Sequence, residues 1–509
     1  MKHTNAMRGA HGARHAGLVV ALAAVLSLAG MLGLGRDGEN RDRWYILEML
    51  GGKVGWMHST VSNDGDKVIS KSEMEFRLKR GGAEVSMAMK TEFVETGEGK
   101  PVSMRSVQKF GTLAIDNQYV FGPENVTLTS RQGDSVKTSK EPLPQGTWLP
   151  PAAAEKYVLQ RMNSGAKEIV VRTIDPSNGL AIATATRSKI EPAKLMVGGR
   201  EVEVTKSSVA VSLLPGVDST EYTDNEGELV RSETALAGMP VILNVATEAE
   251  AKALAAQAAP EVMVSTFIKP SRAIPNARIS RRGVYVLKMD KGDLPPIPET
   301  GSQRVEKLDA GSARVTVSTG GEADAPEADW NDAKYLAATS MCNASDAKVK
   351  ELTQKALANA PKGERQRAEA LRRFVHSYIK DKDLDVGFAS ASEVARNAEG
   401  DCTEHGVLLA GMLRAAGIRA RVASGLIYAD AFAGGTNIFG YHMWAQALVE
   451  ENGKRHWVDL DATFPDIRPF DATHIALGYS ALEDGDPVAG MSSLASLLGR
   501  LSVKVEKVD

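Results

Sequence analysis

One segment of the sequence has residue types that fit nucleophilic catalysis, and it surrounds Cys402. Residues 400–405 read Gly-Asp-Cys-Thr-Glu-His and precede an apolar run that ends at Gly417. Asp401 is a typical N-cap residue and Gly417 a typical residue after a helix end, so we expect a helix that begins at about Cys402 and ends just before Gly417. In the first helical turn the backbone dipole favours a thiolate, the form of cysteine that acts as a nucleophile. The same position also suits a small buried side chain, or half of a disulfide with Cys342, the other of the two cysteines.

Two strands that we predict around a tight turn at Asn452-Gly453 offer a base for this thiol. Pairing across the turn brings opposite charges together, Glu451 with Lys454 and Glu450 with Arg455. The same register makes one face apolar through three pairs: Met443 with Ala462, Ala445 with Leu460 and Ala447 with Val458. The other face carries polar and aromatic side chains: His442, Trp444, Gln446, Trp457, Asp459, Asp461 and Thr463. Because a slip of one residue would exchange the two faces, the pattern specifies the register.

His442 is the predicted base on the polar face, and Asp461 is the predicted carboxylate that orients it. In this register Thr463 lies directly opposite His442, and Asp461 is the diagonal neighbour at about 7–8 Å. Asp459 lies two residues further along the strand, roughly 7 Å more distant. We therefore predict that Cys402, His442 and Asp461 act as nucleophile, base and orienting carboxylate.

Other assignments of these roles are open. His405 is three residues after Cys402 and could lie on the same helical face, but it has no clear carboxylate to orient it. A metal site built from His442, Asp459 and Asp461 is a further alternative, although their spacing matches no common metal-binding motif. The other histidines have no chemical role that the sequence indicates: His456 is predicted to be structural, and His58, His376 and His474 have no identifiable partner.

The elements that must position these residues belong to a helix-rich stretch that begins after Asp332. Apolar residues recur at helical spacing over 349–357 and 368–378. Ser390 with Glu393 forms a capping box, which predicts a further short helix before the nucleophile segment.

The preceding part of the chain has a different texture. Residues 43–244 consist mostly of short runs of alternating polarity bounded by Gly, Asn or Asp, which is typical of antiparallel strands, with one helix expected at about 152–162. A capping box at Thr247 predicts a short helix that closes this region. Proline-rich residues 295–298 and the polar, acidic segment 320–328 are predicted linkers.

The N-terminus has a pattern typical of a targeting signal. Lys2, Arg8 and Arg14 precede an uncharged run over 16–35, which is closed by Arg36. About twenty apolar residues are just enough to span a bilayer, so we predict a signal anchor or a cleaved signal peptide, with a soluble tail as the third alternative. Both favoured assignments place the rest of the chain in the cell envelope, on the periplasmic or extracellular side, secreted or anchored through this segment.

Length and charge narrow the remaining choices. At 509 residues the chain is too long for one hydrophobic core. Its 61 basic and 64 acidic residues give a net charge of -3, which gives no reason to expect nucleic-acid binding. We divide the chain into a signal peptide or anchor (1–36), a β-rich domain (37–260), a small β segment with linkers (261–330), a C-terminal domain (331–480) and a tail (481–509).

The stretch from about Tyr335 to His474 resembles the transglutaminase-like superfamily of bacterial envelope proteins. The resemblance rests on several ordered motifs: Gly387-Phe388-Ala389-Ser390-Ala391, the segment 400–405, Leu413 to Ile418, Tyr441-His442-Met443-Trp444 and Trp457 to Thr463. It implies an α+β chain whose papain-like core domain at the C-terminus follows mainly antiparallel β domains. By this resemblance Cys402 matches the nucleophile, His442 the base and Asp461 the orienting aspartate. Many members have Asp-Pro where this chain has Asp461-Ala462, a change that keeps the carboxylate.

The chemistry that the resemblance implies is thioester formation. The Cys402 thiolate attacks a carboxamide of a protein or peptide substrate, His442 protonates the leaving amine, and the acyl group passes to an amine or to water. The backbone N–H of Cys402 is placed to help bind the oxyanion. A peptidase or amidase of the same fold and a non-catalytic binding or scaffold protein are the alternatives. No cofactor is expected, and no calcium-binding loop is present in the sequence. The region before 330 resembles, loosely, β-sheet ligand-binding domains of bacterial envelope proteins, and a purely structural β domain is the other interpretation.

Overall fold

The computed structural model describes residues 40–80, 83–110, 113–132, 135–213, 216–236, 239–253, 266–380, 389–465, 470–484, 494 and 497–509. The segment predicted to be a signal or an anchor lies outside these residues. Within the described ranges, no helix is both long and apolar enough to cross a membrane. The chain forms two compact units, one built mainly from residues before 262 and the other mainly from residues 262–509.

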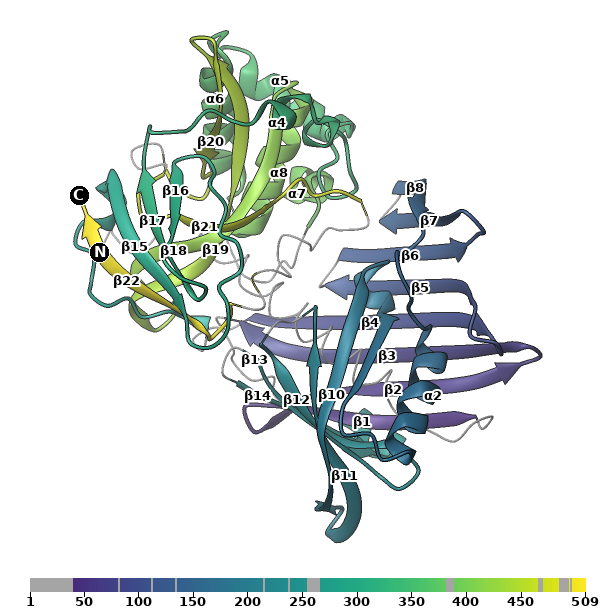
Figure 1. Ribbon diagram of the computed structural model, residues 1–509. Helices are drawn as coiled ribbons and strands as arrows, with labels where there is room; N and C mark the ends of the chain where they lie inside the picture. The colour runs from purple at the N-terminus through teal and green to yellow at the C-terminus, as the bar shows by residue number, and fades with distance from the viewer. Residues whose placement is uncertain are drawn as a thin grey trace. The chain divides into compact units, whose positions relative to one another are not determined.

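One antiparallel sheet of 14 strands makes up most of the N-terminal unit (Figure 1). Its strands are β1 (Arg41–Met49), β2 (Gly52–Asp64), β3 (Lys67–Arg80), β4 (Ala83–Thr96), β5 (Pro101–Phe110), β6 (Leu113–Phe121), β7 (Asn125–Gln132), β8 (Ser135–Pro142), β9 (Ile169–Ile174), β10 (Ile182–Val197), β11 (Arg200–Val211), β12 (Asp218–Thr223), β13 (Leu229–Leu236) and β14 (Met239–Ala246). Because β1 pairs with β14, the first and last strands meet inside the sheet, and a meander extends from each. The prediction of a mainly antiparallel β region is confirmed.

Alternation of side chains explains why this region folds as a sheet. In β7, Val126, Leu128 and Ser130 are buried, whereas the residues between them are partly exposed. This period of two is the pattern of a strand with one face on a core. The helices of the unit are short: α2 (Pro151–Asn163), η2 (Pro176–Asn178) and α3 (Glu248–Lys252). The predicted helix at 152–162 and the capping box at Thr247 are therefore both present.

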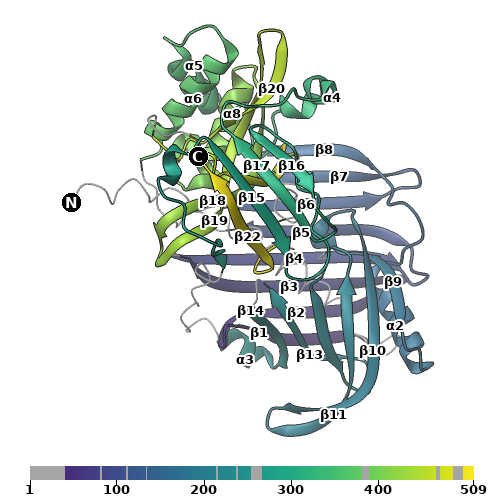
Figure 2. The same cartoon turned by 60° about the vertical axis from the view of Figure 1, so that its left-hand side comes forward.

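The C-terminal unit contains two four-stranded antiparallel sheets and a group of helices (Figures 1 and 2). Its strands are β15 (Arg282–Met289), β16 (Gln303–Lys307), β17 (Ser312–Ser318), β18 (Arg419–Phe432), β19 (Gly435–Glu451), β20 (Lys454–Leu460), β21 (Ile475–Ser480) and β22 (Leu501–Val508). Its helices are η5 (Ala277–Ile279), α4 (Glu327–Asn331), η6 (Ala333–Tyr335), α5 (Ala347–Leu357), α6 (Glu364–Tyr378), α7 (Ala391–Asn397) and α8 (Cys402–Ala415). The sheet orders are β20-β19-β18-β21 and β16-β17-β15-β22.

Helix α8 is the central helix of this unit. Its residues from Cys402 to Arg414 are all buried, since β18 and β19 cover one side and α5, α6 and α7 pack against the others. Gly406 lets the helix lie close to β19: a Cβ there would lie 3.5 Å from the side chain of Met443. The predicted helix and its Asp401 cap are confirmed, and Gly417 follows the helix with a φ of +78°.

The predicted boundaries around this unit need correction. The proposed tail 481–509 contains β22, which pairs with β15 from Gly283–Val508 to Met289–Leu501. The proposed separate segment 261–330 supplies the other strands of the same small sheet and belongs to one compact unit with the residues after it. The prolines at 295–298 lie in a stretch without helix or strand between β15 and β16, but composition alone does not reveal that strands more than 200 residues apart pair.

Candidate active site

The start of α8 is held by a buried capping box. The Asp401 side chain accepts a hydrogen bond from Thr403 N at 2.9 Å, and the Glu404 side chain accepts one from Asp401 N at 3.0 Å. Glu404 also accepts a bond from Ala389 N at 3.0 Å, which ties the helix start to the segment before α7. Burial and the neighbouring Asp401 carboxylate raise the pKa of Glu404 well above its usual value. Cys402 is thus the first residue of a rigidly capped helix.

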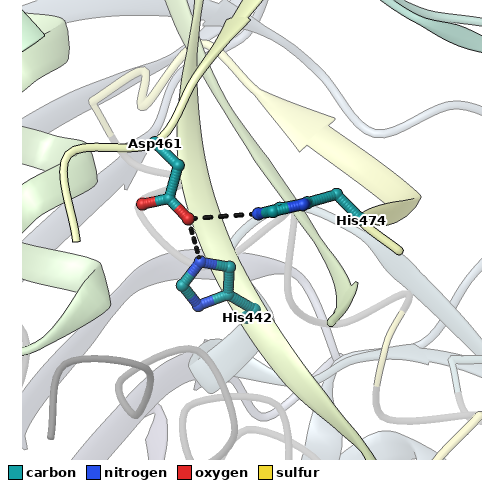
Figure 3. A group of neighbouring side chains, drawn as sticks. All are labelled: His442, Asp461 and His474. Carbon is teal, nitrogen blue, oxygen red and sulfur yellow. Dashed lines mark hydrogen bonds and ion pairs between the residues drawn. The ribbon is translucent and has the colours of Figure 1, made fainter. Parts of the chain in front are cut away.

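His442 and Asp461 meet as the sequence predicts. His442 Nε2 donates a hydrogen bond to Asp461 Oδ2 over 2.6 Å, as Figure 3 shows, and both side chains are fully buried. The observed register agrees with the predicted one from Glu451–Lys454 to Ala445–Leu460. The strand then ends, so the predicted pairing of Met443 with Ala462 does not form.

Asp461 reaches His442 from a turn rather than from a strand. Its Oδ1 accepts hydrogen bonds from Thr463 N at 2.8 Å and from the Thr463 hydroxyl at 2.6 Å. These two bonds close the turn and leave Oδ2 directed at the imidazole. Thr463, predicted to lie opposite His442, instead fixes the carboxylate that orients the ring.

The Cys402 sulfur also acts on His442, through charge and hydrogen bonding. Nδ1 of the His442 ring is buried. Burial by itself would lower the pKa of His442, but the Asp461 carboxylate and the Cys402 sulfur, through charge and hydrogen bonding, raise it to about 9. At neutral pH the imidazole is therefore protonated, so it can donate a proton to a leaving group.

The competing residues are engaged elsewhere. Asp459 accepts hydrogen bonds from Trp444 Nε1 at 2.9 Å and Gln446 Nε2 at 2.7 Å, so it supports the sheet and does not touch His442. His405 directs Nδ1 to the Asp401 carbonyl at 2.6 Å, which places it along its own helix.

Neither cysteine forms a disulfide, so the alternative of a Cys402–Cys342 bridge is not realised. Cys402 and Cys342 are both fully buried, and burial raises the pKa of the Cys342 thiol. Cys342 packs beside the middle of α8, where a Cβ at Gly411 would lie 4.0 Å from its sulfur. Cys342 therefore packs against the middle of α8, more than one helical turn from Cys402 at the start of the helix.

The sequence reasoning missed His474. Its Nε2 donates to Asp461 Oδ2 over 3.2 Å, so the carboxylate lies between two imidazoles (Figure 3). One signal was available: Asp-Ala-Thr occurs at 461–463 and again at 471–473, directly before His474. The remaining histidines lie elsewhere: His376 Nδ1 is 3.0 Å from the Ala462 carbonyl, His456 is beside Arg365, and His58 stacks on Trp44.

His442, Asp461 and His474 also form a group that could hold a metal ion, with their ligand atoms within 4.8 Å of one another. However, Nε2 of His442 and Oδ2 of Asp461 are only 2.6 Å apart. Two ligands of a tetrahedral zinc ion, with bonds of about 2.0 Å, are separated by about 3.3 Å. The spacing is that of a hydrogen bond, so the donor set fits a proton better than a metal ion.

Comparison with known proteins agrees with this geometry. A family model of the transglutaminase-like superfamily matches residues 349–462. This segment is a transglutaminase-like domain. The match covers most of α5, the elements from α6 to β20 and all three predicted site residues.

Three solved structures are similar to larger or different parts of the chain. A β-barrel-like protein of a domain of unknown function from Brucella abortus is 10% identical with a TM-score of 0.33, covering 41% of this chain and 96% of its own. A candidate cysteine protease from Cytophaga hutchinsonii is 13% identical with a TM-score of 0.26, covering 45% and 87%. A candidate protease from Parabacteroides distasonis is 12% identical with a TM-score of 0.19, covering 78% and 70%. No curated protein matches the chain.

The transglutaminase-like match does not contain the whole cluster around Asp461. It ends at Ala462, whereas His474 and its partner Asp471 follow it. The aspartate in turn forms an ion pair with Arg278, which precedes the matched segment by about 70 residues. The site is completed by residues on both sides of the matched domain.

Proposed function

We propose that this chain is a cysteine acyltransferase of the cell envelope that forms a thioester from a protein or peptide carboxamide and passes the acyl group to an amine. The single observation that carries the proposal is the buried arrangement of Cys402, His442 and Asp461 inside a transglutaminase-like domain. The envelope location rests on the apolar N-terminal segment of the sequence.

The proposed reaction has two halves, formation of the thioester and transfer of its acyl group, and Cys402 and His442 act in both. The Cys402 thiolate bonds to the carboxamide carbon, and the imidazolium of His442 gives its proton to the departing amide nitrogen, which leaves as ammonia. Asp461 keeps the ring oriented and stabilises its positive charge. An incoming amine then attacks the thioester and loses a proton to His442, so that a thiolate and an imidazolium are restored.

The burial of the site favours an amine over water as the acceptor. Cys402, His442 and Asp461 are each 0% exposed, so a thioester formed there would be shielded from bulk solvent. Enclosed sites protect reactive acyl intermediates from hydrolysis. Hydrolysis of the same thioester, as in a peptidase or amidase, is the second outcome that an assay must distinguish.

The two cysteines provide a matched test because both are fully buried. We expect Cys402→Ala to lower incorporation of a fluorescent primary amine into a glutamine-rich protein by about 10³-fold or more, and Cys342→Ala to leave it nearly unchanged. Ammonia release measured with and without the amine separates transfer from hydrolysis. In the native protein, mass spectrometry after brief iodoacetamide treatment at pH 7 should find label on Cys402 before Cys342.

Equal labelling of both cysteines would contradict the proposal, because only Cys402 has an imidazolium beside it. A native protein that labels Cys402 selectively but releases ammonia at the same rate without an amine would be a hydrolase of the same fold. Equal losses of thermal stability in both variants, with no selective labelling, would make Cys402 structural and leave a binding or scaffold role.

A further inference from the structure

We propose that His474, held by Asp471 and Arg278, is a second imidazole that positions Asp461 and tunes the proton affinity of His442. The inference rests on the proposed function of the Cys402 site. It adds to that site a chain of charged groups that runs from His442 through Asp461 and His474 to Asp471 and Arg278.

The first observation is that one oxygen of Asp461 accepts hydrogen bonds from two histidines. Oδ2 accepts from His442 Nε2 at 2.6 Å and from His474 Nε2 at 3.2 Å, as the two dashed lines of Figure 3 show. Oδ1 is occupied by Thr463. The carboxylate is therefore bonded on both oxygens, and His474 is one of the groups that decide where Oδ2 points.

The second step is that His474 is itself anchored by a carboxylate. Its Nδ1 lies 3.0 Å from the Asp471 carbonyl and 3.6 Å from Asp471 Oδ1. Asp471 Oδ1 closes a turn with Thr473, accepting from its N–H at 2.8 Å and its hydroxyl at 2.6 Å. Asp461 closes the same kind of turn with Thr463. Each histidine therefore contacts the aspartate of a different Asp-Ala-Thr turn, His442 that of 461–463 and His474 that of 471–473.

The third step is that the second turn is fastened to another part of the unit. Arg278 Nη1 lies 2.9 Å from Asp471 Oδ2, and its Nη2 donates to the Thr473 hydroxyl at 3.0 Å. The Tyr285 hydroxyl of β15 donates to the Ala472 carbonyl at 2.9 Å. Both anchors come from the region before residue 330, which gives that region a direct structural link to the site.

Packing holds the His474 ring in one orientation. His474 is 1% exposed. Its ring stacks on Phe470 with centroids 4.2 Å apart and is nearly perpendicular to the Trp444 ring, with centroids 5.4 Å apart. Its centroid is 5.7 Å from that of His442. A ring fixed at this distance acts on His442 through charge as well as through the shared carboxylate.

The cluster around Asp461 brings charges of both signs together. Burial would lower the pKa of His474, but Asp471 and Asp461 raise it to about 9, and the pKa of Asp461 is held well below its usual range by His442 and His474 despite burial. At neutral pH both imidazoles are therefore positively charged and share the Asp461 carboxylate. Because like charges oppose each other, the positive charge of His474 restrains the pKa of His442.

His474→Gln tests this role because it removes the charge but keeps a side-chain donor for Asp461. Loss of one positive charge about 6 Å away should raise the pKa of His442 by about one unit or more. The full chain, labelled with isotope in its histidines, should show the shift in an NMR titration of the His442 ring. His376→Gln is the control, since His376 also contacts the 461–463 turn but through a backbone carbonyl, and it should leave the His442 pKa unchanged.

Asp471→Asn is the second variant, and it should lower the pKa of His474 in the same titration because its carboxylate partner is lost. An unchanged His442 pKa in folded His474→Gln protein would overturn the proposal and leave His474 as a packing residue. The titration needs no turnover, so it remains decisive if the acyltransferase assay fails. Selective labelling of Cys402 with an unshifted His442 pKa would keep the proposed function and reject only this inference.

Discussion

The Asp461 carboxylate couples the charge of the site to the stability of the fold. The folded pKa values of His442 and His474 are about 9, above the value of about 6.5 expected in the unfolded chain. Their contribution to stability is therefore fully present below about pH 6.5 and is lost as the pH rises through about 9. The pKa of Asp461 is lowered, so its contribution is present above about pH 3.9 and is lost as the pH falls.

Asp461→Asn should flatten this pH dependence. Without the carboxylate, burial dominates and the pKa of His442 falls, so the variant should lose less unfolding free energy than the native protein between about pH 6.5 and 9. At pH 7 the variant should be less stable by a few kcal/mol, about the cost of breaking a buried ion pair. Urea unfolding at pH 5, 7 and 9 measures both effects.

Asp459→Asn is the matched control for this prediction. Asp459 lies two residues before Asp461, on strand β20, and bonds to the neutral donors Trp444 and Gln446. Its replacement should lower stability without changing the slope between about pH 6.5 and 9. An Asp461→Asn slope equal to that of the native protein would show that the alkaline loss of stability has another source.

Two glycines flank helix α8, and they differ in what surrounds them. Gly400 has a φ of +136°, and a Cβ there would lie 2.3 Å from Cβ of Glu404. Gly417 has a φ of +78° and open space around the position of a Cβ. Both conformations favour glycine, but only at position 400 would a side chain also clash, because Glu404 occupies that space.

Gly400→Ala should therefore disturb the start of α8, and Gly417→Ala should serve as its control. Both should lose about 1–2 kcal/mol from the left-handed backbone strain. Gly400→Ala should lose more, because Glu404 must move, and it should also slow iodoacetamide labelling of Cys402. Thermal unfolding and labelling rates measured on both variants test the difference. Equal effects of the two substitutions on labelling would show that the capping box does not position the thiol.

At the scale of the whole molecule, the last strand of the chain belongs to the unit that carries the site. Strand β22 alternates buried Leu501, Val503 and Val505 with exposed residues and pairs with β15. Next to β15 along the chain, η5 supplies Arg278, which anchors the Asp471 turn. The C-terminal strand therefore supports the site through β15, although it lies about 100 residues after Cys402.

Val503→Ala should weaken this small sheet. Lys504→Ala is the control, because Lys504 is the next residue on the strand and its side chain is exposed. Val503 is 2% exposed, so its truncation should cost about 2 kcal/mol, whereas the lysine change should cost less than about 0.5 kcal/mol. Hydrogen exchange measured by mass spectrometry should rise in 282–289 and 497–509 of the valine variant. Unchanged exchange in β15 would mean that β22 does not stabilise the sheet.

Local patterns in the sequence were enough to predict the nucleophile helix and the hairpin. Asp401 and Gly417 delimit α8, and the Asn452-Gly453 turn with its charged pairs fixes the register of β19 with β20. These features depend on neighbours within a few residues or across one tight turn, so the chemistry of the sequence determines them directly. The same register brings Asp461 near His442, but the turn that Asp461 closes with Thr463 directs its carboxylate at the ring.

Only the tertiary structure decided how the site is completed. The roles of His474, Asp471 and Arg278 depend on contacts between segments as far as about 190 residues apart, which a local sequence pattern does not reveal. The pairing of β22 with β15 is equally non-local, and no turn motif or residue spacing in the sequence predicts it. Burial also belongs to the tertiary level: it makes an unpaired charge costly, which is why the buried carboxylates Asp461 and Asp471 are each bonded to cationic side chains.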